Sequence, residues 1–149
     1  MRAVVQRVSQ CRVESGGHVA SEIGPGLLVY LGVTSDDSER DLTYVADKAL
    51  NLRVFDDEAG VMNRSLLEVG GEMMVVSQFT LYGDTRKGRR PSYNHAAAPE
   101  TAVEVYRAFV ARIQDAGVSV GTGVFQAHMD VVSVIDGPVT ILIDSRKQF

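Results

Sequence analysis

Two uninterrupted apolar runs place the strongest constraint on how this chain can fold. They are LLVYLGV (27–33) and the start of EMMVVSQFTLY (72–82), which follows the turn residues Gly70 and Gly71. Runs of this length without alternation are typical of strands covered on both faces. We therefore expect two buried strands, 27–33 and 72–82, in the middle of a sheet, with other elements packed over both sides.

The ends of the chain also predict strands. Residues 2–13 alternate between apolar and polar side chains, which is typical of a half-buried strand, and 19–24 returns after the turn SGGH. Residues 129–135 and 139–144 are β-rich and flank Asp136 and Gly137, a common pair in hairpin turns. We expect these last two segments to form a hairpin. Pro138 is unusual there, because it removes a backbone donor where the second strand should begin to pair.

Two segments change to helical periodicity. In residues 35–52 the apolar side chains fall on one helical face, and Asp36 with Glu39 predicts a capping box. In the second segment Pro99 suits a first helical turn and Gly117 predicts the end. The apolar face of that helix is Ala102, Tyr106, Phe109, Val110 and Ile113. The chain is expected to be one α+β domain (1–149), a mostly antiparallel sheet closing into a barrel-like roll with two amphipathic helices packed on it.

Composition excludes several classes of protein. The charged fraction is 23% with a net charge of −4, which is typical of a globular protein and argues against a surface coated with phosphate-binding residues. No apolar run approaches the roughly 18 residues of a membrane span, and the N-terminus does not resemble a secretory signal. Cys11 cannot form an intrachain disulfide, is expected to be a partly packed thiol, and makes the cytoplasm the default compartment.

Conventional catalytic motifs are missing from the sequence. The histidines His18, His95 and His128 are scattered without metal-ligand spacing, so no metal site is expected. No phosphate-binding glycine loop is present, no cofactor is predicted, and no serine lies in a nucleophile elbow. An enzyme with this sequence would not use a Ser-His-Asp triad or a metal hydroxide.

Two polar features remain. Ser77, Gln78 and Thr80 interrupt the most hydrophobic run. In an alternating strand Ser77 and Phe79 would lie on one face and Gln78 and Thr80 on the other, with one of the two faces wet; if both faces are covered, these polar groups are buried and need partners. The other feature is TRKGRR (85–90), which alone favours a solvated loop, although it could contact phosphates beside a site. Its cationic residues are Arg86, Lys87, Arg89 and Arg90.

The segments SQFTL (77–81) and GPVT (137–140) resemble the two signature motifs of D-aminoacyl-tRNA deacylase, the chiral proofreading enzyme of translation. The resemblance covers essentially the whole chain. It includes QRV (6–8), EIGPGLLVYLGV (22–33), MN (62–63), RPS (90–92) and TGVFQAHM (122–129). The chain differs from the usual pattern at Ile135, where the family has Asn, and at Gln126, where it commonly has Gly.

The resemblance implies hydrolysis of the ester that joins a D-amino acid to the terminal adenosine of tRNA, without a cofactor. The catalytic group would be Ser77, Gln78, Phe79 and Thr80. Backbone N–H groups of Phe79 and Thr80 are the candidate donors to the tetrahedral oxyanion. Thr80 is expected to position the substrate rather than attack it, because no base lies near it in the sequence, and the substrate's ribose hydroxyl would assist the water.

The same resemblance implies how the substrate is held. Phe125 and Met129 would bind the terminal adenine by stacking and sulfur contact, although Phe125 could equally be ordinary core. Arg86, Lys87, Arg89 and Arg90 become candidates for contact with the phosphates of the tRNA acceptor end.

The resemblance further implies a homodimer with active sites at the interface. The Gly137–Pro138 bond would be cis, and the carbonyls of each subunit's dipeptide would enter the partner's site and exclude L-amino acids sterically. Arg7 would brace this dipeptide. Glycine lacks a Cβ and would escape the block, which implies activity on glycyl-tRNA mischarged on tRNA(Ala).

Two other interpretations stay open at the level of sequence. One is a hydrolase of small D-amino-acid esters with no role for RNA, and the other is a noncatalytic interaction module whose Gly-Pro is a hairpin brace. Comparison of hydrolysis of D-Tyr-tRNA, L-Tyr-tRNA and Gly-tRNA would separate them.

Overall fold

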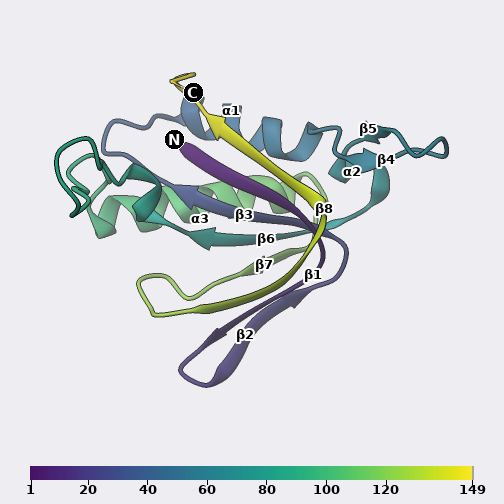
Figure 1. The fold of residues 1–149 in the computed structure, drawn as a ribbon, viewed down its shortest axis with the longest axis horizontal. Helices are drawn as coiled ribbons and strands as arrows, with labels where there is room; N and C mark the ends of the chain where they lie inside the picture. Colours follow the sequence, from purple (N-terminus) through teal and green to yellow (C-terminus); the bar gives the residue numbers. More distant parts are fainter. Residues whose placement is uncertain (149) are drawn as a thin grey trace.

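A computed structural model describes residues 1–148, and within them six strands form one curled sheet (Figure 1). The order is β2-β1-β3-β6-β7, and β8 pairs with β1. The pairs that involve β1 are antiparallel, whereas β6 runs parallel to β3 and β7. The strands are β1 (Arg2–Ser15), β2 (His18–Ile23), β3 (Gly26–Gly32), β6 (Glu72–Ser77), β7 (Val120–Thr122) and β8 (Asp130–Asp144). The predicted fold class is confirmed.

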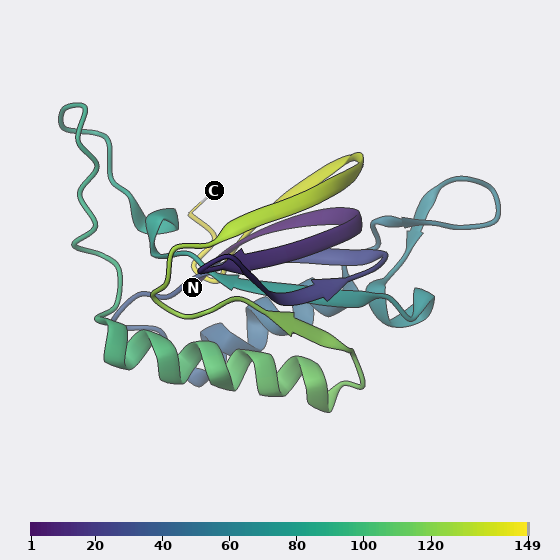
Figure 2. The same cartoon turned by 90° about the horizontal axis from the view of Figure 1, so that it is seen from below.

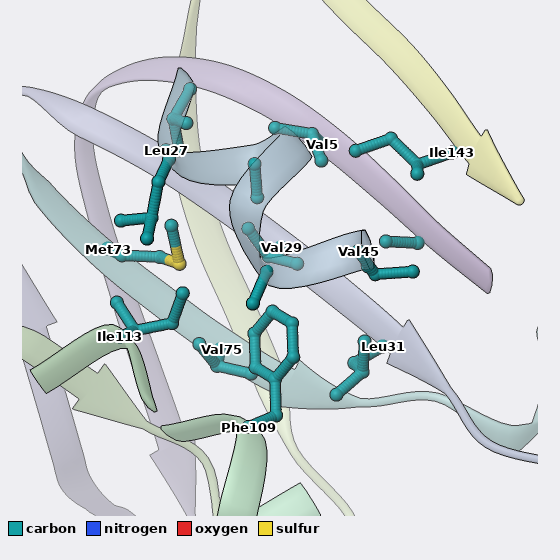
Figure 3. Close-up of a cluster of buried hydrophobic side chains, with 14 of the residues drawn as sticks. Val5, Leu27, Val29, Leu31, Val45, Met73, Val75, Phe109, Ile113 and Ile143 are labelled. Carbon is teal, nitrogen blue, oxygen red and sulfur yellow. The ribbon is translucent and has the colours of Figure 1, made fainter. Parts of the chain in front are cut away.

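Helices α1 (Glu39–Asn51) and α3 (Pro99–Asp115) cover one face of the sheet (Figure 2). Val45 of α1 and Phe109 of α3 are fully buried against β3 and β6 in the main core (Figure 3). Pro99 is at the first turn of α3, as predicted. Because the helices cover one face only, the other face of the sheet needs its own packing.

A second buried cluster fills the inner side of the curl. It contains Val8, Cys11, Val13, Ile23, Leu28, Met74 and Val76. Side chains of β3 and β6 therefore pack on both faces, as their unbroken apolar sequences predict. The expectation of a partly packed Cys11 was wrong, since this residue is 0% exposed. Its polar sequence neighbours point to the opposite face of β1 and say nothing about the face that Cys11 occupies.

The start of α1 differs from the prediction. The reciprocal cap is formed by Ser38 and Asp41, not by Asp36 and Glu39: the Ser38 N–H donates to Asp41 Oδ2 at 2.9 Å. The Asp36 carboxylate instead pairs with Arg146 at 2.7 Å. The chain between β3 and α1 thus contains one more turn than the periodicity indicated.

Strand β6 ends at Ser77, and a short 3-10 helix, η1 (Phe79–Tyr82), follows it. The prediction of a strand through Tyr82 was wrong. The chain turns across Gly32 at the end of β3, where an added Cβ would lie 3.1 Å from the Gln78 carbonyl oxygen. The missing side chain of Gly32 leaves room for the backbone to cross.

The C-terminal segment is one long strand, not the predicted hairpin. Both halves of β8 pair antiparallel with β1, Thr140 with Gln6 and Ile135 with Val8. Arg7 alone therefore stands opposite four residues (136–139), which form a bulge. Asp-Gly and Pro suit a bulge on an edge strand as well as a turn, because the missing N–H of Pro is not needed there.

The remaining elements are short. They are β4 (Phe55–Asp56), β5 (Met62–Arg64) and α2 (Leu66–Val69), and β4 and β5 pair with each other outside the main sheet. None was predicted, because segments of two to four residues carry too little periodicity. Within residues 1–148, no helix has both the length and the apolar character needed to cross a membrane.

Candidate active site

A mainly apolar cleft of about 600 Å³ opens where β6 leaves the sheet. One wall is residues 76–79, another is the loop and helix start from 93 to 102, and the third is residues 125–131. The loop wall is held to the sheet by the Ala97 N–H, which donates to the Val33 carbonyl at 2.9 Å. Ala96, Ala97 and Ala102 leave the space open because their side chains are small.

The predicted catalytic group lies at this cleft. Ser77, Gln78 and Phe79 line it, and Thr80 is exposed immediately after them. The Phe79 ring is 56% exposed and meets the Tyr93 ring edge-on at 5.0 Å. The Gln78 side-chain amide donates to the Thr80 hydroxyl. Within residues 1–148 the backbone N–H groups of Phe79 and Thr80 have no acceptor, so two adjacent donors are free beside the cleft.

Phe125 and Met129 lie on the opposite wall. The Phe125 ring is partly buried and packs against Tyr106 of α3 at 5.9 Å. Burial raises the pKa of Tyr106 to about 12, and its hydroxyl donates to the Val75 carbonyl at 2.8 Å. Met129 packs against the inner core, and its sulfur lies over Gly123, where an added Cβ would be only 2.5 Å from it. Both residues therefore combine partial burial with a surface that faces the cleft.

Gly137 and Pro138 do not line the cleft of their own chain. They are exposed in the β8 bulge, and the bond between them is cis. Arg7 is 7% exposed beneath the bulge. Its Nη1 donates to the Val54 carbonyl at 2.6 Å and to Asp56 at 3.3 Å. One chain thus brings together the first motif and the adenine-site candidates, and holds the second motif apart from them.

The cationic side chains of the basic loop (85–90) differ in whether they are paired. Arg86 is paired with Asp84 at 2.6 Å, and this hydrogen-bonded guanidinium holds the pKa of Asp84 well below its usual range. The side chains of Lys87, Arg89 and Arg90 are exposed and have no partner among residues 1–148. These three cations are free to meet an external anion, whereas the charge of Arg86 is largely compensated.

A second, more polar cleft of about 730 Å³ lies where the N-terminal and C-terminal segments of the chain meet. Its ionic groups pair with one another, since Arg2 lies 3.3 Å from Asp144 and Arg146 lies 2.7 Å from Asp36. Apolar rings and free backbone donors distinguish the cleft beside Phe79, which is therefore the better candidate for a substrate site.

Sequence reasoning missed Tyr93 and the alanines of the loop wall. The loop between 83 and 98 has no periodicity that would place it against β6. A signal was nevertheless present in NHAAAP (94–99), where small residues before a helix allow close approach of a ligand.

Comparisons with known proteins agree with this architecture. A profile of the family described as D-Tyr-tRNA(Tyr) deacylase matches residues 4–144. The D-aminoacyl-tRNA deacylases of Symbiobacterium thermophilum and Clostridioides difficile are each 58% identical to this chain over 149 residues. The alignments cover 100% of this chain, and 99% and 100% of the relatives, respectively.

Two solved structures have the same fold as this chain. The c-Myc DNA Unwinding Element Binding Protein superposes with a TM-score of 0.91 at 38% identity, covering 97% of this chain and 98% of that one. A probable eukaryotic D-amino acid tRNA deacylase has the same fold, with a TM-score of 0.83 at 20% identity over 96% of this chain and 98% of that one. By sequence over its full length, the chain belongs to the D-Tyr-tRNA(Tyr) deacylase family, hydrolases that act on the ester bond of aminoacyl-tRNA.

Proposed function

We propose that this chain hydrolyses the ester bond of D-aminoacyl-tRNA at the cleft beside Phe79, releasing the free D-amino acid and tRNA. The observation that carries the proposal is the pair of free backbone donors at Phe79 and Thr80, at the edge of a cleft whose opposite wall contains Phe125 and Met129. Such a site combines a place for a planar base with donors for a developing negative charge. The substrate is made in the cytoplasm, so we place the enzyme there.

In this proposal the terminal adenine occupies the wall of Phe125 and Met129. A partly buried ring held by Tyr106 offers a rigid face for stacking, and the Met129 sulfur is a polarizable neighbour. The ester then extends toward residues 77–80. The free cations of the basic loop, Lys87, Arg89 and Arg90, would contact acceptor phosphates.

The reaction is attack of water on the ester carbonyl carbon. The carbonyl oxygen becomes an oxyanion, and the N–H groups of Phe79 and Thr80 donate to it. Such a donor typically contributes about 2.7–4 kcal/mol to transition-state stabilisation. Collapse of the intermediate breaks the bond to the ribose oxygen, which leaves as a hydroxyl after it takes the proton that the attacking water has lost.

Thr80 positions the substrate in this scheme. Its hydroxyl accepts a hydrogen bond from the Gln78 amide, and an amide cannot take the proton that a nucleophilic hydroxyl must lose. The neighbouring ribose hydroxyl of the substrate is therefore the group proposed to assist the water.

Chiral selection is proposed to need a second copy of the chain. Gly137 and Pro138 are absent from their own cleft, so only another subunit can bring their carbonyls to it. The β8 edge pairs with β1 alone, and three of its apolar side chains are 51–57% exposed: Val132, Val134 and Leu142. This surface fits a homodimer in which each dipeptide enters the partner's site.

Exclusion by backbone carbonyls explains how one site can accept many different D-amino acids and still reject L-amino acids. A D-amino acid directs its side chain away from the carbonyls, whereas the side chain of an L-amino acid meets them. Glycine has no Cβ to exclude, so the proposal includes hydrolysis of glycyl-tRNA mischarged on tRNA(Ala).

The test is deacylation of D-Tyr-tRNA, L-Tyr-tRNA and Gly-tRNA(Ala) by the purified protein, with D-tyrosine ethyl ester as a fourth substrate. We expect turnover of the D and glycyl substrates, little of the L substrate, and slow hydrolysis of the free ester. Equal rates on the free ester and D-Tyr-tRNA would instead indicate a small-ester hydrolase. A lack of turnover on all four would indicate a noncatalytic module.

A further inference from the structure

Gln126 has a backbone conformation that its side chain disfavours. Its φ is +62°, and Lys147 is the only other residue besides glycine in the described chain with a positive φ. The Ala127 N–H donates to the Val124 carbonyl at 3.2 Å and closes a turn in which Gln126 is the third residue. Glycine and asparagine are preferred at that position because other side chains crowd the backbone. A long amide side chain there needs an explanation.

The folded chain itself provides no explanation. The Gln126 side chain is exposed and has no hydrogen-bond partner among residues 1–148. Gln126 does line the candidate cleft, directly after Phe125 in the chain. Unfavourable backbone conformations persist mainly where a site uses them. The unpaired amide at the mouth of the cleft therefore points to a ligand.

The chemistry of a carboxamide narrows what that ligand can be. It presents one acceptor oxygen and two N–H donors in a plane, so its best partner is a planar edge with a donor beside an acceptor. Adenine has such an edge, an amino group next to a ring nitrogen, and Gln or Asn commonly pairs with it in bidentate fashion. The side chains of amino acids share no such edge, whereas every tRNA ends in adenosine.

We propose that Gln126 is a specificity-determining residue whose side-chain amide binds the donor–acceptor edge of the terminal adenine. This inference rests on the proposed function and adds to it the recognition of the base. Phe125 takes the face of the ring, and Gln126, one residue on, takes its edge. The turn from Val124 to Ala127 places both residues on the same wall of the cleft.

The test compares D-Tyr-tRNA ending in adenosine with D-Tyr-tRNA ending in purine riboside, which lacks the amino group. The variants are Gln126→Gly, which suits the positive φ and removes the amide, and Lys147→Gly, which makes the same backbone change outside the cleft. Both are expected to fold, and to melt at or above the temperature of the parent protein, because glycine tolerates their φ.

We expect the parent to hydrolyse the adenosine substrate about tenfold faster, in kcat/KM, than the purine riboside substrate, as for one bidentate contact. Gln126→Gly should lose about tenfold on the adenosine substrate and treat both alike, whereas Lys147→Gly should keep the preference. A preference that survives in Gln126→Gly, or is absent from the parent, would overturn the inference while deacylation itself still stands. A parent that does not hydrolyse the adenosine substrate would overturn the proposed function, and the inference with it.

Discussion

The guanidinium Nε of Arg7 lies 3.0 Å from Asp136 Oδ2, so the middle of β1 is joined to the β8 bulge by an ion pair. The same side chain donates to the Val54 carbonyl on the other side, at 2.6 Å. Arg7 is therefore a buried connection between the chain before β4 and the segment that carries Gly137. A planar guanidinium can serve both directions at once, which a lysine ammonium cannot do with the same geometry.

Arg7→Met is expected to loosen the bulge and weaken chiral selection. Methionine keeps most of the packing volume but leaves the buried Val54 carbonyl without its donor, which costs about 1–3 kcal/mol of unfolding free energy. The D-to-L ratio of Tyr-tRNA hydrolysis should fall by about tenfold, equivalent to about 1.4 kcal/mol of discrimination. Urea unfolding and the two deacylation rates measure these effects.

Arg64→Met is the control, because Arg64 lies outside the cleft and its two contacts, with Glu58 at 3.6 Å and with the Glu68 carbonyl at 3.0 Å, are at the exposed surface. It should leave both quantities nearly unchanged. An Arg7→Met protein that is less stable but fully selective would show that Arg7 supports the fold and does not brace the dipeptide.

Gly137→Ala should disturb the bulge directly. Gly137 has φ +118°, and an added Cβ would lie 2.8 Å from Val139 Cγ2 and 3.0 Å from its backbone nitrogen. Gly60→Ala is the comparison, since Gly60 also has a positive φ, +74°, but open space around it. We expect Gly60→Ala to lower the free energy of unfolding by about 1–2 kcal/mol through the backbone alone. Gly137→Ala should lower it further and should also reduce the D-to-L ratio of Tyr-tRNA hydrolysis. Equal losses and an unchanged ratio would contradict the prediction.

Thr80→Ala should retain substantial activity. The Thr80 side chain is exposed, and its hydroxyl accepts a hydrogen bond from the Gln78 amide. Loss of this hydroxyl should raise the activation free energy by about 1 kcal/mol, which is about a fivefold fall in kcat. Thr80→Ser keeps the hydroxyl and serves as the control. Single-turnover deacylation of D-Tyr-tRNA gives the comparison. A loss of about 10⁴-fold or more, restored in Thr80→Ser, is the behaviour of a nucleophile and would refute the assignment.

The double variant Arg89→Ala/Arg90→Ala should bind tRNA less tightly and with a weaker salt dependence. Both side chains are exposed cations without partners in the described chain, and each phosphate contact releases about 0.9 counterion. The slope of log Kd against log salt should fall by about 2. Arg40→Ala/Arg107→Ala removes two exposed charges from α1 and α3 as the control. An unchanged slope in the loop variant would identify TRKGRR as a solvated loop.

Periodicity and composition predicted the main sheet, both long helices and the burial of β3 and β6, because these depend on apolar patterns over seven residues or more. The path after Ser77 could not be predicted in this way. It depends on space left by Gly32, and a glycine in one strand gives no indication of which distant segment crosses it. The β8 bulge was missed for a related reason, since Asp-Gly-Pro fits a turn and a bulge equally well until the length of β1 is known.

The same limit applies to the site. The motif residues 77–80, and Phe125 with Met129, meet at one cleft, but no local pattern indicates that the loop carrying Tyr93 forms its third wall. Nor could sequence reveal that Arg86 is compensated by Asp84 while its neighbours are free. These properties arise from contacts made after the chain has folded.

Cys11 should be unreactive in the folded protein. It is fully buried in the inner core, and burial raises the pKa of its thiol to about 11, against about 8.5 for a free thiol. At pH 8 the thiolate fraction falls by roughly two orders of magnitude, since each unit of pKa changes it about tenfold. Alkylation by iodoacetamide, followed by mass spectrometry, should therefore be slow in buffer and fast in urea. Rapid alkylation of the folded protein would show that the inner core opens.

The same shift gives stability a pH dependence of known sign. Between the pKa of the unfolded thiol, about 8.5, and that of the folded thiol, about 11, the unfolded chain loses a proton that the folded chain keeps. The contribution of Cys11 to stability is thus complete below this window and is lost as pH rises through it. Burial also raises the pKa of Tyr30, and the charge of the Cys11 thiolate adds to this shift, so the parent must be compared with Cys11→Ala. The variant should start less stable, because it leaves a cavity, and lose less stability between pH 8 and 10. Parallel curves for the two proteins would mean that the thiol ionises equally in both states.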